Sequence, residues 1–101
     1  LFVGCGKDTE ALNTGIERFH KASLRARKMR MMGSAALGMA YICCGRLDAY
    51  IESTISLWDI AAGKLLVEAA GGKVTLTLKP GKSDVYSIVS TNGKIPIEEI
   101  L

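Results

Sequence analysis

Two apolar segments constrain the fold of this chain most strongly. Residues 34–44 (SAALGMAYICC) contain no charged side chain, and residues 57–70 (LWDIAAGKLLVEAA) contain only three. Ser34 suits the N-cap of a first helix and Gly45 suits the position just past its end, while a Gly-Gly pair ends the second segment. Because such helices have little polar surface, we expect other layers of the protein to cover them on most sides.

Segments typical of strands alternate with these helices. They are residues 1–6, 28–32, 47–54, 73–78 and 85–92. An amphipathic helix of about four turns is predicted after the first strand, from Leu12, Ile16 and Phe19. A turn is predicted over 78–84, and a short helix near Pro96. The alternation predicts a single α/β domain over 1–101, a layered sheet with helices on both faces.

Charge and cysteine usage indicate where such a domain works. Of the basic residues behind the formal charge of +3, five fall in residues 21–30, which reads either as a solvated helix face or as a surface for nucleic acid or membrane. The solvated face is favoured. Cys43 and Cys44 are adjacent and Cys5 is distant, without metal spacing, so we expect free thiols and a cytoplasmic protein. No apolar run reaches the roughly 18 residues of a membrane span.

Candidate functional residues stand where strands give way to helices or loops, the usual place for ligands in open α/β sheets. Ser34 either caps its helix or lets a ligand approach the backbone amides. Glu52 is either a solvent-facing glutamate or an acceptor for ligand hydroxyls, and Asp59 either caps a first turn or binds a cation. Trp58 is interpreted as a packing anchor and His20 as a surface residue.

Residues 30–74 resemble the C-terminal signature region of the inositol monophosphatase family, magnesium-dependent and lithium-sensitive sugar phosphatases. The shared patterns are R-x-x-G-[ST]-A-A, G-x-x-D-A-Y followed by a glutamate, W-D-x-A-A-G and a Gly-Gly pair. The residues in register are Arg30, Gly33, Ser34, Ala35, Ala36, Gly45, Asp48, Tyr50, Glu52, Trp58, Asp59, Ala61, Ala62, Gly63, Gly71 and Gly72. The similarity extends over essentially the whole chain.

The resemblance implies the C-terminal α/β half of the family's fold and a role for each matching residue. Asp59 would be catalytic and hold Mg²⁺, Glu52 would bind the ring hydroxyls of a sugar or inositol phosphate, and Ser34 with Ala35 would line the same side of the substrate. The family's other metal ligands include two aspartates of a D-P-[IL]-D-G-T segment, and no DGT occurs in these 101 residues.

Two functions therefore remain open from the sequence. The first is the C-terminal part of a Mg²⁺-dependent phosphomonoesterase, closer to inositol monophosphatases and fructose bisphosphatases than to nucleotidases, and inactive without an N-terminal half. The second is a non-catalytic half-domain that binds itself or a partner. It rests on the absent metal ligands and on apolar helix surface that a lone chain of 101 residues would leave uncovered. Self-association into a homo-oligomer is expected in either case.

Overall fold

A mixed four-stranded sheet organises the chain. The computed structural model describes residues 1–4, 9–31, 33–79 and 84–100, so the predictions for Cys5, Met32 and the centre of the 78–84 turn lie outside the described residues. In chain order the elements are β1 (Phe2–Gly4), α1 (Thr9–Ser23), α2 (Ala35–Cys43), β2 (Ala49–Ser56), α3 (Leu57–Ala69), β3 (Lys73–Leu78), β4 (Val85–Thr91) and α4 (Ile97–Ile100).

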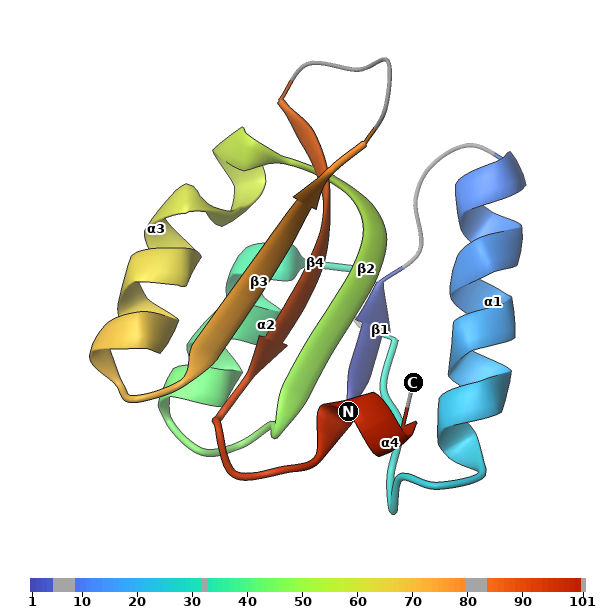
Figure 1. Ribbon diagram of the computed structural model, residues 1–101, viewed down its shortest axis with the longest axis horizontal. Coiled ribbons are helices and arrows are strands. Elements are labelled where there is room, and N and C mark those ends of the chain that lie inside the picture. Colours follow the sequence, from blue (N-terminus) through green and yellow to red (C-terminus); the bar gives the residue numbers. More distant parts are fainter. Residues whose placement is uncertain (5–8, 32, 80–83, 101) are drawn as a thin grey trace.

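The strands lie in the order β1-β2-β4-β3 (Figure 1). β1 runs parallel to β2, while β2 and β3 both run antiparallel to β4. The register of β2 against β4 shifts between Glu52 and Ile55, which marks a β-bulge. The strand carrying Glu52 is thus paired on both sides, and its irregular part leads directly into α3.

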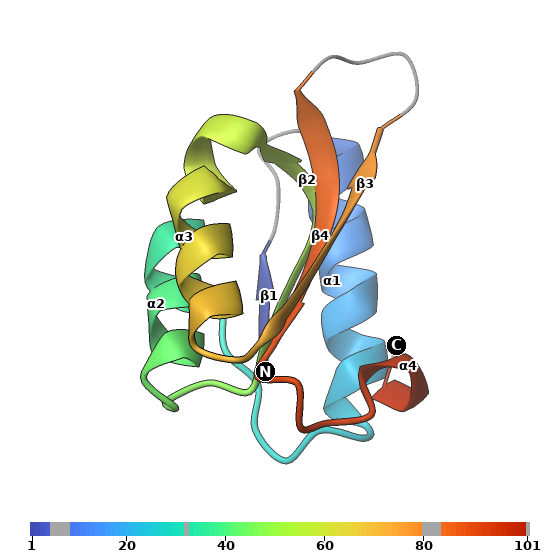
Figure 2. The same cartoon turned by 60° about the vertical axis from the view of Figure 1, so that its left-hand side comes forward.

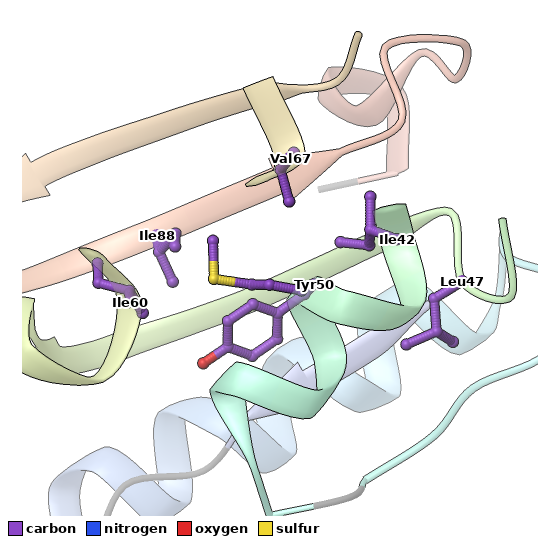
Figure 3. Close-up of a cluster of buried hydrophobic side chains, with 7 residues drawn as sticks. Ile42, Leu47, Tyr50, Ile60, Val67 and Ile88 are labelled. Carbon is purple, nitrogen blue, oxygen red and sulfur yellow. The ribbon is translucent and has the colours of Figure 1, made fainter. Parts of the chain in front are cut away.

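Helices cover both faces of the sheet, as the sequence predicts. α2 and α3 lie on one face, and α1 with α4 lies on the other (Figure 2). Successive side chains of β2 point alternately to the two faces of the sheet and so contribute to the packing on both. Tyr50 joins Met39, Ile60 and other buried residues under α2 and α3 (Figure 3). Ala49, Ile51 and Ile97 form a second cluster on the opposite face.

Both apolar helices end as their glycines predict. Gly45 has a φ of +81° and Gly71 a φ of +90°, conformations that cost glycine little. After α2, the N–H of Arg46 donates to the carbonyl of Tyr41 at 2.8 Å. After α3, the N–H of Gly72 donates to the carbonyl of Val67 at 2.9 Å. These six-to-one bonds are Schellman motifs, which turn the chain from each helix toward the following strand.

The prediction that α2 and α3 are covered on most sides is wrong for this chain. The two helices pack on each other and on the sheet, and in α3 the inward positions Leu57, Ile60 and Val67 supply the contacts. The outward positions remain open to solvent, including Trp58, which is 89% exposed. Other large apolar side chains that stay exposed are Leu12, Ile16, Leu24, Met31, Leu37, Leu65, Leu66 and Leu78.

The prediction of a strand over 28–32 is also wrong for its described part. Arg30 forms an isolated bridge, in which its N–H donates to the carbonyl of Leu1 at 2.8 Å. The ammonium of Leu1 also donates to the carbonyl of Lys28 at 3.1 Å. These two contacts do not extend into a ladder, because both involve Leu1 alone. In the described part of the chain, no helix is both long and apolar enough to span a membrane.

Candidate functional site

Asp59 lies in the first turn of α3, directly beyond the end of β2. Ser56 is the N-cap residue, and its hydroxyl donates to Oδ2 of Asp59 at 2.9 Å instead of accepting from a backbone amide. The S-x-x-D spacing therefore makes a side-chain pair at the positive end of the helix dipole, where a carboxylate is favoured. Asp59 is exposed, so its carboxylate stays accessible.

Glu52 is buried, which excludes its interpretation as a solvent-facing residue. Only 8% of Glu52 is exposed, and its Oε1 accepts a hydrogen bond of 2.7 Å from the hydroxyl of Tyr50. The two residues share one face of β2 because they are two positions apart on a strand. The bond holds the carboxyl group under α2 and α3.

The electrostatics of this pair connect it to Asp59. Burial raises the pKa of Glu52, the hydrogen bond from Tyr50 opposes that rise, and the negative charge of Asp59 adds to it. The pKa of Tyr50 is raised far above its ordinary value, first by burial and then by the bond to Glu52. Tyr50 therefore remains a neutral phenol that donates a hydrogen bond to the glutamate. Asp59 lies close enough for its charge to raise the pKa of Glu52.

Ser34 and Ala35 begin α2 on the same face of the sheet. The hydroxyl of Ser34 accepts a hydrogen bond from the N–H of Leu37 at 3.2 Å, which confirms the capping interpretation. Ala35 packs against the cluster that contains Tyr50. Figure 3 shows the Tyr50 ring within this cluster, with its hydroxyl pointing toward the end where Ile60 lies. The starts of both helices thus adjoin one buried tyrosine.

Trp58 does not act as a packing anchor in this chain. The core face of α3 is formed by Leu57, Ile60 and Val67, and Trp58 falls outside that helical spacing. At 89% exposure its indole is open to solvent beside Asp59. His20 is exposed on α1, as predicted, and Cys43 and Cys44 are free thiols.

The described residues do not form a complete magnesium site. Within those ranges, no group of three or more His, Cys, Asp or Glu side chains comes together. Mg²⁺ takes near-octahedral oxygen coordination, and proteins commonly supply one or two carboxylates to it, with waters and substrate phosphates completing the shell. Asp59 has the right donor and is accessible, but the described part of the chain places no group of ligands around it.

Two features of this site were missed from the sequence. The sequence does not single out Tyr50 as the hydrogen-bond donor to Glu52, although the two-residue spacing on a strand allows that pairing. Ser56 was not identified as the partner of Asp59, although a hydroxyl three residues before a carboxylate at a helix start is a recognisable capping signature.

The model of the inositol monophosphatase family matches residues 5–94 of this chain. The chain belongs to the inositol monophosphatase family. A fructose-1,6-bisphosphatase/inositol-1-monophosphatase of Thermotoga maritima is 41% identical over 86 residues, covering 84% of this chain and 32% of its own length. A Nus factor SuhB of Xylella fastidiosa is 57% identical over 51 residues, covering 50% of this chain and 18% of its own.

Solved structures of this family share the fold. The chain superposes on an inositol monophosphatase from Anabaena with a TM-score of 0.79 and 39% identity, over 94% of this chain and 40% of the other. The SuhB protein of Mycobacterium tuberculosis gives a TM-score of 0.82 and 31% identity, over 98% of this chain and 38% of the other. The chain thus spans no more than about two fifths of these proteins' length.

Proposed function

We propose that this chain forms the polyol-binding side of a magnesium-dependent phosphomonoesterase acting on inositol phosphate or a related sugar phosphate. The observation that carries the proposal is the buried, hydrogen-bonded pair of Tyr50 and Glu52 on β2. The accessible carboxylate of Asp59 lies just beyond the end of this strand and near enough to raise the pKa of Glu52. Membership of a family of sugar phosphatases supports it.

In this proposal each residue has one role. Glu52, oriented by Tyr50, accepts hydrogen bonds from ring hydroxyls of the substrate, and Ser34 and Ala35 line the same side. Asp59 supplies one carboxylate to Mg²⁺ in the longer protein, whose other ligands lie outside this chain. A buried acceptor suits hydroxyl recognition, because a substrate that lacks the hydroxyl makes one hydrogen bond fewer to this buried group, at a cost of about 1–3 kcal/mol.

The experiment is phosphate release by a chimera in which this chain replaces the aligned part of the Thermotoga maritima relative. Asp59→Asn is expected to abolish release from every substrate. Glu52→Gln is expected to lower kcat/KM about tenfold or more for inositol 1-phosphate and leave p-nitrophenyl phosphate, which has no ring hydroxyl, unchanged. Glu98→Gln in α4 serves as the charge-matched control. Full activity of the Asp59→Asn chimera would refute the proposal.

The isolated chain is expected to release no phosphate from either substrate in the presence of Mg²⁺. The reason is that Asp59 belongs to no group of three or more possible ligand side chains in the described part of the chain. The same assay on this chain and on its Asp59→Asn variant checks the expectation. Release that the substitution removes would show that the missing ligands come from a second copy or from the undescribed residues.

A second function is favoured by the exposed apolar side chains. Leu37 on α2 and Leu65 and Leu66 on α3 are exposed, on the helices that the sequence predicts to be covered. This surface suits a self-associating half-domain, whose monomer would bind itself without catalysis. Sedimentation across a concentration series tests it, and a monomer at all concentrations would exclude a homo-oligomer of this chain.

A further inference from the structure

A pocket lies at the end of the sheet opposite Asp59. Its volume is about 450 Å³. The residues that define this basic pocket are Arg25, Arg27, Lys28, Arg30, Arg46 and Asp48. Asp48 precedes β2 and Ser56 ends it, so about 26 Å of extended strand separates the basic pocket from the start of α3. Figure 1 shows α3 beginning at the top of the sheet, whereas the cyan segment after α1 passes below it.

The positive charge of the chain is concentrated around this pocket. Residues 18–47 contain seven of the thirteen Lys and Arg residues and none of the ten Asp and Glu residues. Asp48 is the acidic residue in the lining, and its Oδ1 accepts a hydrogen bond of 2.9 Å from Asn92. Arg27, Lys28 and Arg46 form no ion pair with any residue that the structure describes. Unneutralised cations around one hollow attract an anion.

Two of the arginines are already held in place by their own chain. The guanidinium of Arg30 donates from Nη1 to the carbonyl of Met29 at 2.8 Å, while that of Arg46 lies 5.5 Å from the centre of the Tyr41 ring. Cation–π contact and a backbone hydrogen bond restrict long side chains that otherwise lose much entropy on binding. The basic pocket is therefore partly organised for a ligand.

The chemistry of the lining indicates a small phosphorylated molecule. Guanidinium and ammonium groups match phosphate oxygens, and the volume falls within the usual range of small-molecule sites. Leu47 and Ile95 add apolar lining that suits the carbon skeleton of an organic phosphate. A nucleic acid would be bound by cations that follow a backbone along a groove, whereas these converge on one hollow. We propose that the basic pocket binds a small organic phosphate, independently of the site at Glu52 and Asp59.

Titration of this chain with glucose 6-phosphate, followed by backbone amide NMR, tests the proposal. Shifts are expected at residues 25–30 and 46–48 and not at 52–59, and glucose alone should cause none. Lys28→Gln is expected to raise the Kd about threefold or more. Lys73 is an exposed lysine on β3 outside the pocket, so Lys73→Gln should leave the Kd unchanged. Arg46→Gln provides a second variant in case Lys28→Gln alters the fold.

Three outcomes would overturn the proposal. Equal weakening by Lys28→Gln and Lys73→Gln would mean that only net charge matters. Leu1 also lines the pocket. Loss of binding on acetylation of its ammonium would show that this group, and not the basic side chains, holds the phosphate. Tight, steeply salt-dependent binding of a single-stranded oligonucleotide without any shift from glucose 6-phosphate would identify the surface as a nucleic-acid site.

Discussion

Gly63 allows α2 and α3 to touch, and its replacement by alanine is the most informative perturbation of this fold. A Cβ at position 63 would lie 2.7 Å from Sδ and 3.0 Å from Cβ of Met39, which is fully buried. Real Cβ contacts are essentially never as short as the first of these distances. Met39 or the helix backbone must therefore move when residue 63 gains a methyl group.

The magnitude follows from two opposing effects. Gly→Ala in a helix interior gains about 1 kcal/mol of helix stability, whereas overpacking a core costs about 1–3 kcal/mol. Gly63→Ala alone should therefore destabilise the chain by about 0–2 kcal/mol. Met39→Ala alone should cost about 2–5 kcal/mol because it leaves a cavity. In the Met39→Ala background the contact with Sδ is gone and only the 3.0 Å contact with Cβ remains, so Gly63→Ala should stabilise by up to about 1 kcal/mol.

Urea unfolding of the wild type, Gly63→Ala, Met39→Ala and the double variant, followed by circular dichroism, measures the coupling energy between the two positions. We expect a coupling energy of about 1–3 kcal/mol, with a change of sign between the two backgrounds. Ala61→Gly provides the matched control, because Ala61 is exposed on the same helix. This substitution should lower the free energy of unfolding by about 1 kcal/mol in both backgrounds. An identical effect of Gly63→Ala with and without Met39 would refute the claim that these residues set the helix contact.

Three further predictions concern the residues at the candidate site. Ser34→Ala should lower the free energy of unfolding by about 1 kcal/mol, measured by urea unfolding, because the N–H of Leu37 loses its acceptor; an unchanged midpoint would contradict the capping role. Glu52→Gln should stabilise the chain at pH 7, because burial raises the pKa of Glu52. The wild-type chain has its full stability below the unfolded-state pKa of about 4.3, and it loses stability as pH rises through the folded-state pKa, because Glu52 must then ionise while buried. Unfolding from pH 4 to pH 8 checks the sign, and a benefit that grows toward low pH would contradict it. Trp58→Ala should change stability by less than about 0.5 kcal/mol because the indole is 89% exposed, and a larger loss in thermal unfolding would show that it packs in solution.

The glycines and strand faces could be predicted because they depend on neighbouring residues alone. The positive φ values of Gly45 and Gly71 follow from helices that stop there, and the opposite orientation of Tyr50 and Ile51 follows from the strand period. The burial of Glu52 could not be predicted in the same way. An alternating strand has a polar and an apolar face, and which helices cover a face is decided by packing between distant segments.

Tertiary packing also explains the sequence predictions that were wrong. Trp58 was expected to be buried because tryptophan has a large apolar surface, but Leu57 and Ile60 occupy the face of α3 that meets the sheet. Residues 28–31 have strand-like composition, but Lys28 and Arg30 reach only the backbone of Leu1, and no ladder forms. The basic pocket could not be foreseen because Arg46 follows the cluster at 25–30 by a whole helix and joins it only in the folded chain.

By itself, the sequence determined the α/β class, the limits of α2 and α3 and the family, and it singled out Asp59 and Glu52 as candidate site residues. Local dihedral preferences, side-chain periods and motif spacing carry that information along the chain. Only the tertiary structure decided that Glu52 is buried against Tyr50, that Ser56 holds Asp59, and that cations gather at the other end of β2. Burial and electrostatic environment arise when distant segments exclude water together, so no local pattern specifies them.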